Sequence, residues 1–470
     1  MADSWRRKHT RESIMLLRLL IVGLFASGWS VTIASAAEPA DASVSFRRDL
    51  APVLRDQCLA CHSAQKTEGG YRLDTFAMLL KPGDSGDMPV TAGKPDESEL
   101  LRRLESDDES ERMPYESDPL PADFVKLVRR WIAQGARYDG GDPSAPIVTI
   151  VAPGTHPPPP ETYARPLPVA AMAWIRQGDR WLLATGGYRE LLLWDPVQAT
   201  LVRRVGNLPS RIHGMAVDTK RNRVAVAGGE PGRLGEVRIV DTGSWEVVAV
   251  PWVRGDVVLS VAVDEVHGRW AAGASDGYVA VINGEDLTVL WSAEVHKEWV
   301  KQIAWSPQGD RIATAGFDDQ AIVVSAKDGK IEQVFAEHKQ PVWGISFLPD
   351  GKDVVSGDES ARAFFWSVSD GKKQVEVRVG GGVFALLAGD GGLFAGARGG
   401  RVVKLDGKTR KESGRWSGPK GRVVSLAWEP SKQWLAAGTD LGEVWVWRLK
   451  EKNQAWHWTH RVTATLQPQP

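Results

Sequence analysis

The stretch SPQGDRIATAGFDDQAIVVSA, residues 306–326, is matched in pattern by LPDGKDVVSGDESARAFFWSV, residues 348–368. Each starts with a turn containing proline and glycine, continues as a short apolar run, and turns again into a second apolar run. A glycine in such a turn supplies the positive φ that a tight hairpin requires. The two stretches therefore predict successive antiparallel hairpins of a repeated β-structure.

The same unit can be followed through most of the chain. Five more copies align with these two, and the first hairpin of each ends at a glycine, 39 to 45 residues from the next. These glycines are Gly186, Gly228, Gly273, Gly316, Gly357, Gly396 and Gly438. A period near 40 residues with several strands per unit is typical of propeller blades. The pattern predicts an all-β, seven-bladed propeller over residues 167–466, followed by a tail, 467–470.

Details inside the units resemble the WD40-repeat family. Trp194-Asp195 is a literal WD pair, and His296 and His338 precede the first strands of the fourth and fifth units, where WD40 repeats carry a Gly-His pair. We expect both histidines to tie a strand to a turn by hydrogen bonds. The strand tryptophans are expected to pack between blades. They are Trp174, Trp194, Trp305, Trp343, Trp366, Trp428 and Trp447.

The sequence allows two ways of closing the propeller ring. AWHWTHRVTATL, residues 455–466, could form the outer strand of the last blade. Alternatively PIVTIVAP, residues 146–153, could form a short strand that adds to the last blade and seals the ring. A ring left unsealed would expose open sheet edges.

A different chemistry is indicated upstream of the propeller. The two cysteines of the chain, Cys58 and Cys61, stand in CLACH and are followed at once by His62. This is the C-x-x-C-H signature of c-type haem attachment, in which both thiols bond to the porphyrin and the imidazole binds the iron. A zinc site would need a second ligand pair in the same domain, where His62 is the sole histidine. The sequence predicts one haem c per chain, with Cys58 and Cys61 as thioethers and His62 as proximal iron ligand.

Three methionines are candidates for the distal iron ligand. Met78 lies in the amphipathic segment RLDTFAMLL, where a core role explains it, whereas Met88 and Met113 lie in irregular loops, GDSGDMPV and ERMPYESDPLP. A distal thioether is usually held by such a loop. Helical patterning surrounds the loops: FRRDLAPVLRDQC, DESELLRRL with Asp96 as cap, and PADFVKLVRRWIAQGA with Gly135 as stop.

Residues 46–137 resemble the planctomycete-type cytochrome c domain. The segments that carry the resemblance are the CLACH region with its following glycine turn, AGKPDESELLRRL, ERMPYESDPLP and WIAQGARY. The resemblance implies a small all-α class I cytochrome c domain over residues 38–140 with Met113 as distal ligand. It departs from the family at Tyr115, where a second proline is favoured, and at GDMPV, so Met88 stays as the alternative. A proline-rich linker, 141–166, follows.

The first 37 residues have the composition of an export signal. Arg6, Arg7, Lys8 and Arg11 precede an apolar run that ends in Ala34-Ser35-Ala36, a small-x-small boundary. We expect cleavage there and a periplasmic location, with an uncleaved membrane anchor as the alternative because the run is long. No later segment approaches 18 consecutive apolar residues.

Charge and composition narrow the function. A net charge of −1 argues against a nucleic-acid binder, and residues 38–139 hold 20 acidic and 14 basic side chains, a balance of −6. That stretch is either a solvated acidic surface or a docking face for a basic redox partner.

The propeller shows no catalytic constellation, since Asp318-Asp319 and Asp358-Glu359 fall at turns. We therefore expect no enzyme, but an electron carrier or sensor whose partner protein contacts the cytochrome face and propeller loops. The alternative is a periplasmic oxidoreductase whose propeller holds a substrate or second cofactor.

Overall fold

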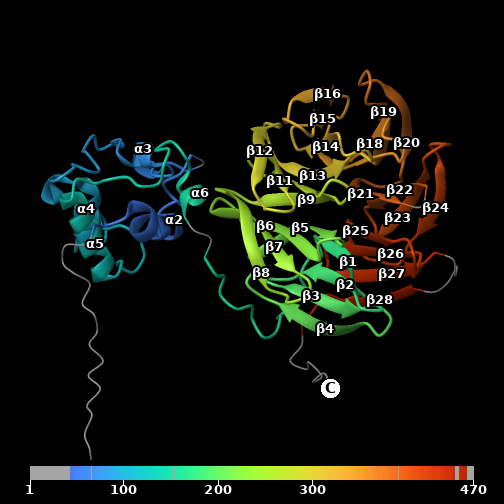
Figure 1. Ribbon diagram of the computed structural model, residues 1–470, viewed down its shortest axis with the longest axis horizontal. Coiled ribbons are helices and arrows are strands. Elements are labelled where there is room, and N and C mark those ends of the chain that lie inside the picture. The colour runs from blue at the N-terminus through green and yellow to red at the C-terminus, as the bar shows by residue number, and fades with distance from the viewer. Residues whose placement is uncertain (1–42, 65, 152–153, 390, 450–454, 463–470) are drawn as a thin grey trace, which may run out of the picture. The chain divides into compact units, whose positions relative to one another are not determined.

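The computed structural model in Figure 1 describes residues 43–64, 66–151, 154–389, 391–449 and 455–462. A helical region comes first along the chain and an all-β region follows. The expected signal segment, 1–37, and the tail, 467–470, lie outside the described residues. No helix within the described ranges is long and apolar enough to cross a membrane.

Helices and tight turns make up the regular structure described in residues 44–151. A π-helical turn, Phe46–Leu50, leads directly into α2 (Ala51–Gln57). The later helices are α3 (Phe76–Leu79), α4 (Glu99–Glu105), α5 (Ala122–Ala133) and α6 (Ile147–Ile150), with 3-10 turns at Glu68–Gly70 and Pro95–Glu97. The helices predicted around 46–58 and 121–136 are confirmed, and α5 ends before Gly135, whose φ is +94°. A small helical region is therefore present.

An aromatic cluster forms the centre of the helical region. The Phe46 and Phe76 rings meet edge to face at 4.9 Å between centroids, and Phe76 stacks on Tyr138 at 4.4 Å. Trp131 of α5 is 1% exposed, and its indole N–H donates to the Arg137 carbonyl at 2.9 Å. Residues from both ends of the region thus share one core, which holds the segments between them in place.

Helix α4 starts later than the sequence predicted. Asp96 is not its cap, because Pro95–Glu97 form a separate 3-10 turn, and the N-cap position of α4 is Ser98. The Ser98 hydroxyl donates to the Lys94 carbonyl and accepts from the Thr91 N–H, both at 2.9 Å. Pro95 favours the tight turn because its φ is fixed and it has no N–H to offer.

The strand predicted at 146–153 is wrong. Ile147–Ile150 form α6, a single helical turn, and Ile147 donates its N–H to the Asp74 carbonyl at 2.8 Å. Ile147, Val148 and Ile150 are buried with the helical core. Burial of these β-branched side chains within the helical core overrides their strand propensity.

The β-region is a ring of seven four-stranded antiparallel sheets, so the predicted seven-bladed propeller is confirmed. Each blade uses four consecutive strands, ordered from the inside of the ring outward (Figure 1). The first blade consists of β1 (Met172–Gln177), β2 (Arg180–Gly186), β3 (Leu191–Asp195) and β4 (Thr200–Val205), and the second of β5 (Arg211–Asp218), β6 (Arg223–Glu230), β7 (Leu234–Asp241) and β8 (Val247–Arg254). The third blade consists of β9 (Val258–Asp264), β10 (Arg269–Ala274), β11 (Tyr278–Asn283) and β12 (Val289–Glu294), and the fourth of β13 (Val300–Trp305), β14 (Arg311–Gly316), β15 (Ala321–Ser325) and β16 (Ile331–Phe335). The fifth blade consists of β17 (Val342–Phe347), β18 (Asp353–Asp358), β19 (Arg362–Ser367) and β20 (Lys373–Arg378). The sixth consists of β21 (Val383–Gly389), β22 (Gly392–Ala397), β23 (Arg401–Asp406) and β24 (Glu412–Trp416), and the seventh of β25 (Val423–Glu429), β26 (Trp434–Thr439), β27 (Glu443–Arg448) and β28 (Ala455–Thr459).

The second and third strands of each blade are covered by neighbouring blades on both faces. β18 is buried along its whole length, and β14 and β10 are buried after their first residue. Such strands read as continuous apolar runs, because both faces of the sheet are covered. The tryptophan prediction is confirmed for Trp194 and Trp366, which are 5% and 0% exposed. Trp343 lies between the Phe317 ring of the fourth blade and the Phe384 ring of the sixth, and it also lines the central cavity.

In the fifth blade, His338 joins strand and turn as predicted. Its Nδ1 lies 2.7 Å from the Asp358 carboxylate and its Nε2 lies 2.7 Å from the Ser356 hydroxyl. The Trp366 indole N–H donates to the same hydroxyl at 3.1 Å. All four side chains belong to buried residues, so the network is protected from competing water.

His296 makes the corresponding bonds in the fourth blade. Its Nδ1 lies 2.9 Å from the Asp318 carboxylate and its Nε2 lies 2.8 Å from the Thr314 hydroxyl. Asp318 and Asp358 are therefore structural turn residues, in agreement with the prediction that these acidic pairs belong to turns.

The ring is closed through the C-terminal segment. β28 is the outer strand of the last blade, which confirms one of the two predicted solutions and excludes the strand at 146–153. The chain entering the first blade also bonds to the last one: the Val169 N–H donates to the Thr439 carbonyl at 2.9 Å, and the Tyr163 N–H donates to the Val462 carbonyl at 3.0 Å. Both ends of the propeller thus meet at one seam.

Candidate functional site

The CLACH segment forms a turn at the end of α2. Cys58 caps the helix and donates its N–H to the Leu54 carbonyl at 3.0 Å. Its own carbonyl accepts from the N–H groups of Cys61, at 3.2 Å, and His62, at 3.0 Å. The helical direction therefore continues through the motif, and both thiols and the imidazole emerge from a single turn of backbone.

The His62 imidazole is fixed by the backbone that follows it. Its Nδ1 lies 3.2 Å from the Tyr71 carbonyl oxygen, and its ring packs edge to face on the Tyr71 ring at 5.4 Å. A carbonyl only accepts, so Nδ1 carries the proton and the Nε2 lone pair is left for another partner. Burial lowers the pKa of His62, which keeps the ring neutral near pH 7. A neutral imidazole held by its Nδ1–H is the form in which histidine binds a metal.

The two thiols occupy different surroundings. Both cysteines are unpaired; Cys58 packs against the helical core, whereas Cys61 is exposed. Burial, and then the neighbouring Cys61, raise the pKa of the Cys58 thiol to about 12. No cluster of three or more His, Cys, Asp or Glu side chains that could hold a metal ion occurs in the part of the chain that the structure describes. The CLACH turn itself presents two thiols and one imidazole.

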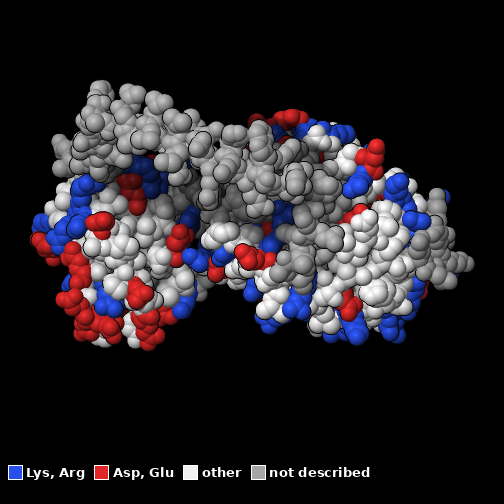
Figure 2. Space-filling view, turned by 90° about the horizontal axis from the view of Figure 1, so that it is seen from below, with Lys and Arg blue, Asp and Glu red and all other residues white. Residues whose placement is uncertain are grey.

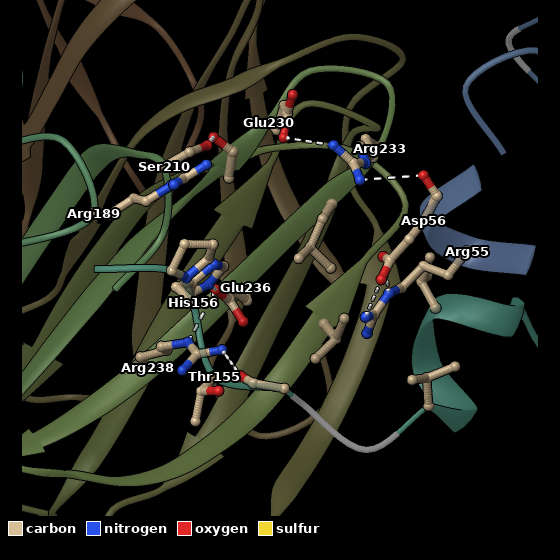
Figure 3. A pocket seen from close by; sticks show the side chains of 17 residues that line it. Arg55, Asp56, Thr155, His156, Arg189, Ser210, Glu230, Arg233, Glu236 and Arg238 are labelled. Carbon is tan, nitrogen blue, oxygen red and sulfur yellow. Dashed lines mark hydrogen bonds and ion pairs between the residues drawn. The ribbon is translucent and has the colours of Figure 1, made fainter. Parts of the chain in front are cut away.

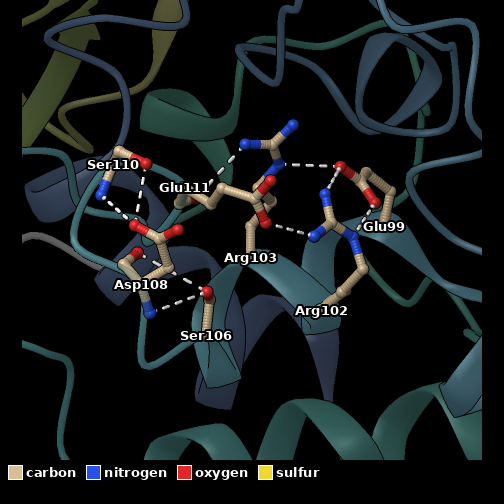
Figure 4. A network of polar contacts seen from close by, with 7 residues as sticks. All are labelled: Glu99, Arg102, Arg103, Ser106, Asp108, Ser110 and Glu111. Atoms are coloured by element: carbon tan, nitrogen blue, oxygen red, sulfur yellow. Dashed lines mark hydrogen bonds and ion pairs between the residues drawn. The ribbon is translucent and has the colours of Figure 1, made fainter.

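The loop that carries Met113 is tied to α4 (Figure 4). The Met113 N–H donates to the Arg103 carbonyl at 3.0 Å. The Arg103 side chain donates to the Glu111 carbonyl at 3.3 Å, a contact drawn in Figure 4. Arg102 forms an ion pair with Glu111 at 2.6 Å. Glu99 accepts from both arginines, at 2.6 and 2.7 Å. Mainly through its hydrogen bond with Arg102, this arrangement lowers the pKa of Glu99, so its carboxylate stays charged.

The three candidate methionines lie in different environments. Met113 is half-buried and packs against the helical core that also contacts Cys58. Met88 is 49% exposed. Met78 lies within α3 and is half-buried, but it is not among the residues that pack against the helical core. The structure brings Met113 and Cys58 to one core and leaves Met88 largely in solvent.

Comparisons with known proteins agree with both halves of this description. Residues 58–116, from Cys58 to just beyond Met113, match the family described as planctomycete cytochrome C. Residues 287–325, 329–367 and 410–448 match the family described as WD domain, G-beta repeat. The chain joins a planctomycete-type cytochrome c domain to a WD40-repeat propeller. In each matched WD40 unit, the family's repeat starts with the outer strand of one blade and ends with the third strand of the next.

Relatives are found through the propeller. The chain is 28% identical over 177 residues to "WD repeat-containing protein 1" of Xenopus tropicalis, covering 36% of this chain and 27% of the relative. It is 28% identical over 146 residues to the protein of the same name in Mus musculus, covering 30% and 23%. It is 30% identical over 121 residues to "WD repeat-containing protein VIP3" of Arabidopsis thaliana, covering 23% and 37%. The chain spans about a quarter of the length of the first of these relatives.

The cytochrome domain carries an acidic surface around its methionine loop. Seven exposed acidic residues flank Met113 in sequence: Glu105, Asp107, Asp108, Glu109, Glu116, Asp118 and Asp123. Figure 2 shows acidic side chains crowded along one edge of this domain. Arg112 is the sole basic residue in the same stretch and is half-buried. A surface of this kind favours encounter with a basic partner at low ionic strength.

A buried charge cluster holds the linker on the second blade of the propeller. His156 and Glu236 of β7 form a very short contact, and Arg238 pairs with Glu236 at 3.0 Å (Figure 3). Arg238 also donates to the Gly154 carbonyl at 2.7 Å. Burial alone would raise the pKa of Glu236, but the hydrogen bonds from His156 and Arg238 lower it overall. The sequence left His156 without a role; its partner is 80 residues away, which no local pattern reveals.

Proposed function

We propose that this chain is an exported electron-transfer or redox-sensing protein that binds one haem c through Cys58 and Cys61. His62 is the proximal iron ligand, Met113 is the distal ligand, and the propeller serves as the docking platform for a protein partner. The proposal includes a class I cytochrome c fold over residues 38–140, a linker over 141–166 and a propeller over 167–466.

The observation that carries the proposal is the state of His62. Its Nδ1–H is taken by the Tyr71 carbonyl, and it follows directly on a turn that presents two free thiols. A histidine positioned merely for packing would not need its remaining nitrogen available beside two cysteines. Haem supplies a one-electron ferric/ferrous couple when bound. The protein contributes ligand orientation through Tyr71, and a tethered methionine through α4 and Glu111.

The acidic surface and the propeller support a role in docking. Exposed carboxylates next to the Met113 loop would orient a basic redox partner on the cytochrome domain. WD40 propellers commonly bind other proteins, and the relatives carry the same kind of repeat. We favour a carrier over an oxidoreductase, and no second cofactor is required by this proposal.

Export is part of the same proposal. Thioether formation to haem takes place outside the cytoplasm, and residues 1–37 have the composition of a signal peptide ending in Ala34-Ser35-Ala36. We therefore propose a periplasmic location. The N-terminal sequence of protein from the periplasmic fraction should begin at Ala37 or Glu38; an intact N-terminus in the membrane fraction would establish an anchor instead.

Covalent attachment can be tested with three variants of the full chain. Acid-acetone should leave haem on the wild type, and also on Cys58→Ser and Cys61→Ser, because each single variant keeps one thioether. The double variant should release all of its haem or contain none. A double variant that retains haem after extraction would disprove the assignment.

The choice between carrier and oxidoreductase needs a cofactor inventory. Iron and haem should each be present at one per chain, with no other metal or organic cofactor in the purified protein. A second redox cofactor at the same stoichiometry would favour the oxidoreductase.

A further inference from the structure

The inner strands of the propeller carry β-bulges, and the side chains at these bulges form a ring around the central cavity. In six of the blades the pairing between the inner strand and its neighbour shifts by one residue near the start of the inner strand. A residue at such a bulge is unpaired and its side chain is redirected. These residues and their counterpart in the first blade line the central cavity: Ala170, His213, Leu259, Lys301, Trp343, Phe384 and Val424.

The cavity that this ring encloses is about 280 Å³ in volume. At roughly 30 Å³ for each water-sized volume, it holds about nine such volumes, enough for a small organic molecule. The residue after Lys301, Gln302, bridges the fourth and sixth blades beside this cavity. Its side-chain amide donates to the Leu386 carbonyl and accepts from the Leu386 N–H. This bridge passes Gly344, where an added Cβ would come within 3.1 Å of Leu386. The channel therefore has a polar cross-link beside its ring of bulge residues.

Lys301 is the unusual member of the ring. Its side chain forms no hydrogen bond or ion pair with any described residue, and its ammonium lies 5.8 Å from the centre of the Trp343 ring. None of the described residues that line the cavity is Asp or Glu. Burial lowers the pKa of Lys301 to about 8. Lys301 is half-buried at the cavity wall, so its amine faces the cavity without a counter-charge among the described residues, and a bound anion would supply one.

His213 stands in the same ring and is not a second cation. Burial lowers its pKa to about 3, and Lys301 and Arg211 act in the same direction. Its ring also lacks a hydrogen-bond partner among the described residues. Near neutral pH the cavity thus presents one positive charge, one neutral imidazole able to donate or accept, and two aromatic faces.

We propose that this cavity binds a small monoanionic carboxylate with an aromatic or apolar body, with Lys301 as its charge partner and His213 as a hydrogen-bond partner. One positive charge matches a monoanion, whereas a phosphate dianion would remain half-neutralised in an apolar channel. The rings of Trp343 and Phe384, 5.2 Å apart and edge to face, give the body of the ligand an aromatic wall.

A continuous aromatic path connects the cavity to the surface. Trp299 is 47% exposed and stacks on Phe317 at 5.1 Å, and Phe317 meets Trp343 at 4.8 Å. The exposed Trp299 thus lies at the surface end of a row of rings whose inner member, Trp343, lines the cavity. A free small acid and the carboxyl terminus of a peptide ending in an aromatic residue share the required chemistry.

The test uses calorimetric titration of the full chain. Phenylacetate represents the free acid, the peptide Gly-Gly-Phe represents the carboxyl terminus, and phenylacetamide is the neutral isostere. We expect at least one of the two anions to bind, and the amide to bind at least tenfold more weakly. The anion that binds identifies the source; binding by neither at 20 mM would overturn the proposal.

Two lysine variants separate a charge effect from a general one. Lys301→Met should weaken binding of the anion at least tenfold, while Lys301→Arg should retain it. Lys297→Met is the matched control, because Lys297 lies near the same strand end, pairs with Glu294 and has a side chain 82% exposed; it should bind as the wild type does. Equal binding by Lys301→Met would overturn the assignment.

The melting temperature supplies an independent check. Lys301→Met removes an amine without a counter-charge, so its Tm should be at least that of the wild type. A Tm equal to or above that of the wild type, together with lost binding, excludes unfolding as the cause. The haem-attachment residues are untouched in these variants, so failure here leaves the electron-transfer proposal to its own test.

Discussion

The imidazole Nε2 of His460 lies 3.0 Å from the hydroxyl oxygen of Thr185, a residue 275 positions earlier. The Trp194 indole N–H donates to the same hydroxyl at 2.8 Å, and His460 Nδ1 lies 3.2 Å from the Leu167 carbonyl. This is the network that His338 makes with Ser356 and Trp366 inside the fifth blade. Where the ring closes, His460 comes from the C-terminal end of the propeller, whereas Thr185 and Trp194 come from its first blade. This follows because each WD40 repeat begins with the outer strand of one blade and ends with the third strand of the next.

His460→Ala should therefore destabilise the whole ring. The substitution removes a fully buried side chain and leaves a buried carbonyl and hydroxyl short of a partner, at a cost of about 1–3 kcal/mol for each unsatisfied group. Urea unfolding followed by tryptophan fluorescence would measure the loss. His457→Ala is the control, since His457 stacks on Trp445 in an outer strand and should cost much less. Equal losses would show that His460 has no special part in closure.

The same histidine should make stability depend on pH. Burial lowers the pKa of His460 from 6.5 to about 4, opposed by its hydrogen bond to Leu167. The unfolded chain takes up a proton first as the pH falls, so this contribution to stability is complete above pH 6.5 and is lost progressively toward pH 4. His460→Gln should show a shallower decline in unfolding free energy over that window. His213 shifts in the same direction and will keep part of the slope. An unchanged slope would contradict the buried neutral state of His460.

Ser356→Ala should be costly for a small change in volume. The hydroxyl serves the Trp366 N–H and His338 Nε2 at once, and its loss leaves both without that partner in a dry interior. We expect about 2 kcal/mol or more from two such groups. Ser346→Ala in the same blade removes a buried hydroxyl whose hydrogen bond to the Phe347 carbonyl is long, at 3.4 Å. The difference between the two variants in urea unfolding measures the network; similar losses would argue that it contributes nothing specific.

The propeller was predictable because its signals are local and repeated. Each blade has its own hairpin turns and apolar runs, so the count of seven survives small errors of alignment. The alignment of the repeats contains such an error. Gly357 pairs with Gly344, which follows the bulge in the inner strand of its blade, whereas Gly316 pairs with Val300, which precedes the bulge in the inner strand of its own blade. The aligned glycines are thus not fully equivalent. A shift of one residue hides which side chain stands at the bulge, so the cavity ring of Lys301 and His213 was not foreseen.

The helical region was less predictable where burial overrides local preference. Ile147–Ile150 have strand propensity but bury their side chains in a helical turn, and Pro95 displaces the start of α4 from Asp96 to Ser98. The proposed haem-attachment motif is different, because its chemistry lies in five adjacent residues, Cys58 to His62. The Tyr71 carbonyl that orients His62 is a backbone group, which no side-chain pattern indicates.

Glu99→Gln should loosen the loop that carries Met113. The Glu99 carboxylate holds Arg102 and Arg103, and both arginines contact Glu111. Loss of its charge should reduce the stability of the cytochrome domain by about 1 kcal/mol, because the network is only partly buried. Limited proteolysis near Met113 should also become faster. Glu97→Gln is the control, since Glu97 pairs with Lys94 in solvent. Unchanged proteolysis would show that the loop is held by its backbone alone.

The ligand assignment makes the sharpest prediction. Met113→Ala should abolish the ferric sulfur-to-iron charge-transfer band while the haem stays covalently bound, and the reduction potential should fall, because a thioether favours ferrous iron. Met88→Ala is the matched control: Met88 is 49% exposed in its own loop and should leave the band unchanged. The opposite outcome for the two variants would make GDMPV the ligand loop and the alignment to the ERMP segment wrong. A wild type without the band would mean that another group, or an exchangeable position, completes the iron coordination. An exchangeable position is where a small molecule can react, so that result would favour the oxidoreductase over the carrier.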